Sequence, residues 1–227
     1  MNLYNIYIIC KTITLFNSIK EQFTPYIDKI NHIQWIPSEF LKVTKDNQYD
    51  LLCSLNTRYN TLLKNKVSKL GCIAAHRKAL LAIINNKTTN NIILEEDAIL
   101  VNQLPEPPNQ SCYLGGWIIP PQISKAGKVK INIDVKQNEL NNIDYLNFKV
   151  LMAHSYFIKS IEESIDILQS TFKKIKNYDV HLTDNRFIKF FYYPPIFKQG
   201  KHTSDIDHKM NKNDIYTENY GLNIKLT

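Results

Sequence analysis

The sequence of 227 residues has only six glycines and no long apolar stretch. The glycines form neither a G-x-G-x-x-G nor a G-x-x-x-x-G-K-[ST] pattern, so a glycine-rich phosphate-binding loop is not expected. The absence of G-x-S-x-G argues against an α/β-hydrolase. No apolar run reaches the roughly 18 residues of a membrane-spanning helix. The apolar start from Tyr4 to Cys10 lacks the basic lead-in and cleavage site of a signal peptide. We therefore expect a cytoplasmic protein without a transmembrane segment.

Closely spaced cysteines are also missing. The four cysteines, Cys10, Cys53, Cys72 and Cys112, lie far apart, and no Cys-x-x-Cys pair occurs. This spacing indicates neither a zinc site nor a disulfide framework, and it suits a reducing compartment. Three of the four have apolar neighbours in the sequence, where cysteine commonly packs as a small core residue.

Positive charge is in excess but is not concentrated in one segment. The 28 Lys and Arg residues outnumber 21 Asp and Glu residues, which gives a net charge of +7 and a pI of about 9.1. A solvated basic surface explains this charge, and so does attraction to an anionic ligand such as a nucleotide diphosphate or nucleic acid. Because no basic run reaches five residues, we do not expect a nucleic-acid partner.

Apolar patterning predicts a single α/β domain over residues 1–227, with a polar and loosely held tail from about residue 207. The expected strands are 5–10, 33–36, 92–94, 111–114, 150–158 and 187–193, and the expected helices end near residues 23, 85 and 174. The middle helix begins at Ser68 and has one apolar face, made of Cys72, Ala75, His76, Ala79, Leu80 and Ile83. Residues 117–146 are expected to form a long surface loop.

An acidic triplet, Glu95-Glu96-Asp97, directly follows the apolar run Ile92-Ile93-Leu94. Adjacent carboxylates raise one another's pKa unless a positive group compensates them. A hard cation such as Mg²⁺ or Mn²⁺ would do so, because it prefers carboxylate oxygens. Ligands of open α/β sheets bind outside the carboxyl ends of the strands, which is where the triplet is expected. A solvated turn is an equally good interpretation of the triplet by itself.

Two histidines and two aspartates are weaker candidates for functional-site residues. His76 lies on the apolar face of its expected helix and His154 lies in an expected strand, so both fit hydrogen-bonded core residues as well as ligands. Asp179 and Asp184 are five residues apart, and either could be a general base if it reaches the proton that it removes.

Six short segments occur along the chain in a fixed order. They are Gly71-Cys72-Ile73-Ala74-Ala75-His76, Ile93-Leu94-Glu95-Glu96-Asp97-Ala98, Tyr113-Leu114-Gly115, His154-Ser155-Tyr156-Phe157-Ile158, Asp179-Val180-His181 through Asp184, and Tyr193-Pro194-Pro195 through Gln199 with Ser204-Asp205-Ile206. Their order resembles that of the family 25 glycosyltransferases, the lipooligosaccharide-type and collagen-type galactosyltransferases. Each motif is short, but all six occur in the family's order, and the resemblance as a whole spans about residues 4 to 206.

The resemblance implies a GT-A-type nucleotide-sugar-binding fold, with a single mixed sheet flanked by helices. It implies transfer of galactose or glucose from a UDP-sugar to a hydroxyl of a glycan or protein acceptor. The transfer would invert the configuration at the anomeric carbon and would use Mn²⁺ or Mg²⁺ as a cofactor. The residues that it assigns to the donor site are Glu95, Glu96, Asp97, His76, Gly115 and His154. Asp97 and Glu95 are the expected metal ligands, and Asp184 or Asp179 is the expected base.

A second interpretation is a sugar- or nucleotide-binding protein on the same scaffold with impaired catalysis. The family's first strand is usually followed by arginines that suit a diphosphate. The corresponding stretch here, Cys10 to Thr14, contains none.

Overall fold

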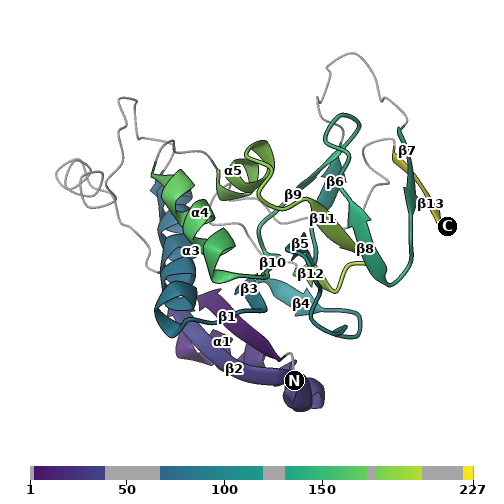
Figure 1. Ribbon diagram of the computed structural model, residues 1–227. Coiled ribbons are helices and arrows are strands. Elements are labelled where there is room, and N and C mark those ends of the chain that lie inside the picture. Colours follow the sequence, from purple (N-terminus) through teal and green to yellow (C-terminus); the bar gives the residue numbers. More distant parts are fainter. Residues whose placement is uncertain (1–2, 39–66, 120–130, 173–176, 201–221, 227) are drawn as a thin grey trace.

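A mixed sheet of seven strands forms the centre of the protein (Figure 1). The computed structural model describes residues 3–38, 67–119, 131–172, 177–200 and 222–226. The strand order in the main sheet is β2-β1-β3-β10-β5-β11-β8. The expected α/β class, with a mixed sheet and helices packed on it, is confirmed. Three additional two-stranded sheets accompany the main one.

The first three strands of the main sheet run parallel. β1 (Tyr4–Cys10) is hydrogen-bonded to β2 (Ile30–Pro37) on one side and to β3 (Asn91–Glu95) on the other. The chain passes from β1 through α1 (Ile13–Glu21) and the 3₁₀ helix η1 (Thr24–Lys29) to β2. It then returns to the opposite side of β1 for β3. The carboxyl ends of β1 and β3 therefore lie at a point where the direction of winding reverses, which is where open α/β sheets bind ligands.

Four further strands, in both directions, extend this parallel part. β10 (Ser155–Ile158) pairs antiparallel with β3 and with β5 (Cys112–Tyr113). β11 (Phe190–Tyr193) then pairs parallel with β5 and antiparallel with β8 (Glu139–Asn142). The small sheets pair β12 (Phe197–Gln199) with β4 (Ala98–Leu100), β6 (Trp117–Ile119) with β9 (Lys149–Leu151), and β13 (Leu222–Leu226) with β7 (Ile131–Val135).

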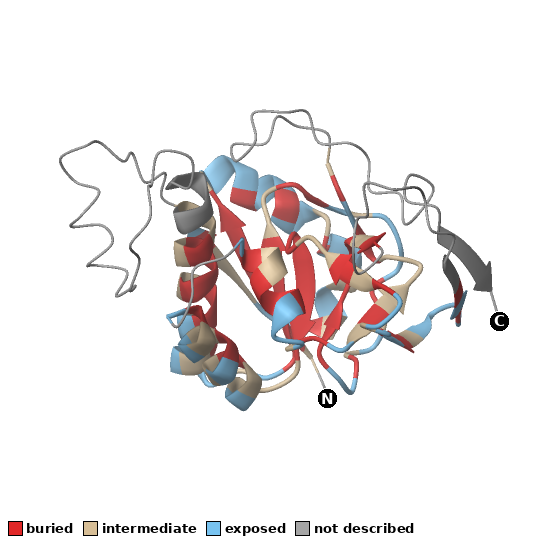
Figure 2. Cartoon of the chain, turned by 90° about the horizontal axis from the view of Figure 1, so that it is seen from above, coloured by how far each residue is buried: buried red, intermediate tan, exposed pale blue. Residues whose placement is uncertain are grey.

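Alternate residues of the central strands enter two different cores. Successive side chains of a strand point to opposite faces. In β3, Ile92 and Leu94 join the core that contains Phe16 of α1, whereas Ile93 joins the core under α3. Figure 2 shows these buried strands between helices whose outer faces are exposed. Glu95 follows Ile93 by two residues, so this alternation directs its side chain toward α3.

Helix α3 (Val67–Asn86) covers the sheet as expected. Its predicted apolar face is confirmed, because Ala75, His76, Ala79, Leu80 and Ile83 are buried and Cys72 packs against them. The buried Arg77 joins this helix to α4 (Ile161–Thr171): its Nε donates to Thr171 Oγ1 at 2.8 Å and its Nη2 to Thr171 O at 2.7 Å. None of the described helices is long and apolar enough to cross a membrane.

The structure departs from three sequence predictions. The expected strand 150–158 is two strands, β9 and β10, because Met152 adopts φ 84° and the chain turns between two different sheets. The expected surface loop contains three strands: β6 is a short apolar run, and β7 and β8 contain polar residues that mask the strand pattern. Part of the expected loose tail, Leu222–Leu226, forms β13, whereas residues 201–221 lie outside the described residues.

We predict that Gly115→Ala destabilises the protein by about 1–3 kcal/mol, as overpacking does in well-packed regions. A Cβ at Gly115 would lie 2.4 Å from Phe197 O and 2.6 Å from His154 Nε2. The matched control is Gly200→Ala, where the nearest atom is the side-chain Cδ1 of Ile99 at 3.1 Å. Urea denaturation should show a lower midpoint for Gly115→Ala than for Gly200→Ala. Equal midpoints would contradict the close packing of this turn.

Candidate functional site

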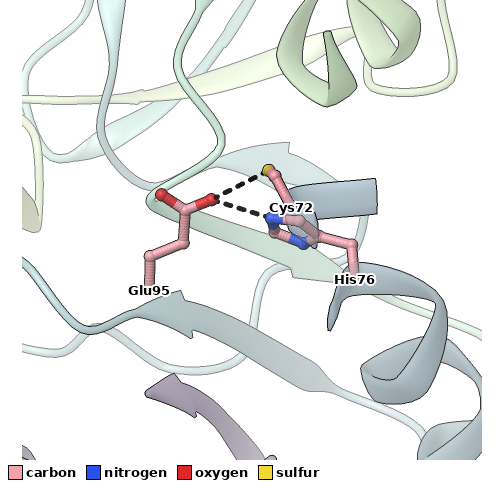
Figure 3. Close-up of side chains that lie close together, drawn as sticks. All are labelled: Cys72, His76 and Glu95. Carbon is pink, nitrogen blue, oxygen red and sulfur yellow. Dashed lines mark hydrogen bonds and ion pairs between the residues drawn. The ribbon is translucent and has the colours of Figure 1, made fainter. Parts of the chain in front are cut away.

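Glu95, the last residue of β3, is the centre of a polar cluster on the α3 side of the sheet. Its Oε1 accepts a hydrogen bond from His76 Nε2 at 2.8 Å, and Cys72 Sγ donates to the same oxygen at 3.8 Å. Cys72 and His76 are four residues apart on α3 and therefore share a face of that helix. Figure 3 shows both side chains converging on one oxygen of Glu95, while its other oxygen points away from them.

His76 is held on both of its ring nitrogens. Its Nδ1 lies 2.9 Å from the hydroxyl of Tyr156, which lies 3.0 Å from the hydroxyl of Tyr178. The imidazole also stacks on the Tyr178 ring, with centroids 3.9 Å apart and planes at 8°. Tyr156 comes from β10 and Tyr178 from α5 (Tyr178–Asp184), so three elements fix this buried imidazole. His76 is thus a hydrogen-bonded core residue that also contacts the acidic site.

The electrostatics of Glu95 favour its charged form. Burial by itself would raise the pKa of this carboxyl group. The hydrogen bond and charge of His76 outweigh burial, with help from the charge of His154 and the hydrogen bond from Cys72, and hold the pKa of Glu95 below its ordinary value. Burial and the negative charge of Glu95 in turn raise the pKa of the Cys72 thiol.

The three carboxylates of the triplet point to different partners. Glu96 accepts from the backbone N–H of Lys11 at 3.1 Å, and it forms an ion pair with Lys11 Nζ at 3.1 Å. Asp97 is buried, and its Oδ2 accepts from Gln199 Nε2 at 2.7 Å. Glu96 therefore links the carboxyl ends of β3 and β1, whereas Asp97 is fixed by β12. The triplet is not a single cluster of parallel side chains.

His154 contacts Glu95, and Gly115 lies next to His154. The carbonyl of His154 accepts from the backbone N–H of Glu95 at 2.9 Å, and its side chain is buried. The missing side chain of Gly115 leaves room for the His154 ring, whose Nε2 would lie 2.6 Å from a Cβ at that position. Of these two predicted site residues, His154 thus contacts the end of β3 and Gly115 packs against His154.

Asp179 and Asp184 differ in their relation to this cluster. Asp179 lies in the first turn of α5. Burial raises its pKa, the backbone N–H groups of Val180 and Met152 lower it, and the negative charge of Glu95 raises it further. Asp184 is exposed at the other end of the helix. Five residues turn an α-helix by roughly 500°, so the two carboxylates project about 140° apart. The structure therefore brings Asp179, rather than Asp184, toward Glu95.

The ligand atoms of Cys72, His76 and Glu95 all lie within 4.8 Å of one another, so these residues could hold a metal ion. The expected metal ligands were Asp97 and Glu95, and the cysteine spacing argued against a zinc site. The cysteine spacing does not bear on this cluster, because the partners of Cys72 are a histidine one helical turn away and a glutamate on a strand. The Cys-x-x-x-His spacing on one helix face was the signal that could have indicated this cluster.

Comparison with protein-family models and with curated proteins finds no match to this chain.

We predict that Glu95→Gln removes a pH-dependent part of the stability. Because the pKa of Glu95 is lower in the fold than in the unfolded chain, its carboxylate stabilises the fold at neutral pH. This contribution declines once the pH drops below the ordinary glutamate pKa and is lost as the pH falls through the lowered value. Urea denaturation of both proteins, with a chelator present, should show a gap in unfolding free energy that closes in acid.

The matched control repeats this comparison in a His76→Asn background. Without its main partner Glu95 has a less depressed pKa, so the pH-dependent gap should be smaller there. A gap that is the same at every pH in the wild-type background would contradict the proposed ionisation of Glu95.

Proposed function

We propose that this protein is an inverting, metal-dependent glycosyltransferase that transfers a hexose, galactose or glucose, from a UDP-sugar to a hydroxyl of a glycan or protein. The observation that carries the proposal is the position of Glu95, Asp97 and Asp179. Glu95 and Asp97 lie at the carboxyl end of β3, beside the end of β1, where the winding of the sheet reverses. A mixed sheet with a ligand site at this edge is compatible with the GT-A-type fold that the resemblance implies.

Asp97 and Glu95 would hold the divalent metal. Carboxylate oxygens are the ligands that Mn²⁺ and Mg²⁺ prefer. Asp97 is oriented by Gln199, and one oxygen of Glu95 is directed away from Cys72 and His76 (Figure 3). When bound, such a metal neutralises the charge of a diphosphate leaving group. The rest of the site binds and orients the donor, and the excess of positive charge attracts it.

Asp179 is the better candidate for the base that takes the proton from the acceptor hydroxyl. Inversion needs a carboxylate on the far side of the sugar from the leaving diphosphate. Burial and the charge of Glu95 raise the pKa of Asp179, and a higher pKa makes a carboxylate a stronger base. Asp184 remains the alternative from the sequence motif, although it is exposed at the opposite end of α5.

A second candidate function is binding of a sugar or nucleotide without catalysis. The ion pair between Lys11 and Glu96 favours this candidate. Lys11 directly follows β1, and its positive charge is neutralised by Glu96. A diphosphate would have to compete with Glu96 for Lys11. This candidate predicts donor binding without release of UDP.

We predict that the purified protein, incubated with UDP-hexoses and Mn²⁺, binds a donor and releases UDP. Asp97→Asn should abolish metal-dependent donor binding, measured by calorimetry. The matched control is Asp166→Asn, which changes an exposed aspartate of α4 and should leave binding unaltered. Absence of binding by every UDP-hexose tested, in the folded wild-type protein, would contradict both candidate functions.

Asp179→Asn should lower the rate of transfer by about 10²–10⁴-fold, the usual contribution of a general base, with little loss of donor affinity. Asp184→Asn should have a much smaller effect on the rate. The opposite order would assign the base to Asp184, and donor binding without turnover by the wild type would favour the second candidate.

A further inference from the structure

We propose that Cys72, His76 and Glu95 form a binding site for a borderline transition metal of the zinc type. This site shares Glu95 with the carboxylate metal site of the proposed function, but its other ligands differ and it does not depend on that function. It offers one sulfur, one imidazole nitrogen and one carboxylate oxygen, all within 4.8 Å of one another. Thiolate and imidazole select zinc-like ions, whereas Mg²⁺ and Mn²⁺ prefer all-oxygen sites.

The distances between the donor atoms are close to those of a tetrahedral site. With usual zinc bond lengths, nitrogen and oxygen ligands lie about 3.4 Å apart and sulfur and oxygen ligands about 3.6 Å apart. The corresponding distances here are 2.8 Å from His76 Nε2 to Glu95 Oε1 and 3.8 Å from Cys72 Sγ to the same oxygen. An ion would therefore need to spread the His76–Glu95 pair by about half an ångström and draw Cys72 in slightly.

Tyr156 and Tyr178, here called the tyrosine pair, orient His76 for metal binding. A metal-binding histidine usually donates its second ring N–H to a fixed acceptor. When Nε2 carries a proton for Glu95, the Tyr156 hydroxyl donates to Nδ1 and accepts from Tyr178. When Nε2 binds a metal, Nδ1–H donates to the Tyr156 hydroxyl, which then donates to Tyr178. Within the chain from His76 through Tyr156 to Tyr178, the same heavy-atom contacts serve both arrangements and only the hydrogens change position.

Metal binding releases protons to solvent. The Glu95 carboxylate enters as an anion, the Cys72 thiol loses its proton, and His76 loses the proton at Nε2 while Nδ1 carries one. A divalent ion therefore displaces one proton in total when His76 starts as a neutral imidazole, which gains its Nδ1 proton in exchange, and two when it starts as an imidazolium, which already has it. Three protein ligands leave a fourth position for water or an anionic oxygen, as in zinc sites that keep an open position.

The experiment uses the full chain, freed of metal with a chelator that is then removed, and Co²⁺ as a spectroscopic substitute for zinc. The wild-type protein should show a thiolate-to-cobalt absorption band together with the intense visible bands of four-coordinate cobalt, and one equivalent of Zn²⁺ should remove both. Cys72→Ser should lose the thiolate band. The control variants Cys10→Ala and Cys53→Ser remove thiols at other positions and should keep it.

Tyr156→Phe tests the supporting role of the tyrosine pair. This variant retains all three ligands, so it should keep the thiolate band while its affinity for Co²⁺ falls by about 10–100-fold, as loss of an outer hydrogen-bond partner typically does. Asp97→Asn, which should abolish donor binding under the proposed function, should leave the cobalt spectrum unchanged. The two proposals therefore fail independently.

Absence of the thiolate band in folded wild-type protein at millimolar Co²⁺ would overturn the proposal and leave the cluster as a hydrogen-bonded one. A band that persists in Cys72→Ser, or that vanishes in Cys53→Ser, would also overturn it by assigning the sulfur to another cysteine. Circular dichroism of each variant establishes that it is folded before its spectrum is interpreted.

Discussion

The contact between His76 and Glu95 connects the main parts of this structure. It joins helix α3 to the carboxyl end of β3, and through Tyr156 and Tyr178 it extends to β10 and α5. It also decides the ionisation of the site, because it offsets the burial of Glu95 and keeps the carboxylate charged. Without such a partner, burial would raise the pKa of this carboxyl group. The pair of His76 and Glu95 therefore both holds α3 against the end of β3 and favours the charged form of Glu95.

The sheet explains why the polar groups meet where they do. β1 has parallel neighbours on both sides, and the chain changes its direction of winding between them. The carboxyl ends of β1 and β3 therefore adjoin one another, and Lys11 meets Glu96 across them. The period-two alternation of β3 turns Glu95 to the α3 side, where Ile93 also lies. Adjacent acidic residues thus acquire different environments and can have different roles.

The carboxylates of the triplet are oriented by different elements, and this affects how they could hold a metal. Asp97 is fixed from the side of β12 and Glu95 from the side of α3, so the two carboxylates are oriented by different elements. Glu95 has one oxygen toward the sulfur and nitrogen ligands of α3 and another directed away from them (Figure 3). One residue can therefore belong to two sites of different metal preference. The donor atoms would distinguish the cations: hard ones would bind between Glu95 and Asp97, and borderline ones between Glu95 and the sulfur and nitrogen ligands of α3.

The sequence by itself determined the elements that are long and strongly patterned. The strand after Asn5, the apolar face of α3 and the strand before Glu95 could all be predicted, because apolar residues recur there with the period of the element that they form. The motif order also drew attention to His76, Glu95, Asp97 and Asp179. Tertiary structure decided the rest. Cys72 meets Glu95, and Asp179 rather than Asp184 approaches it, only because α3, β3 and α5 pack at one end of the sheet. Such contacts join residues far apart in the chain, and local patterning does not report the distances between them.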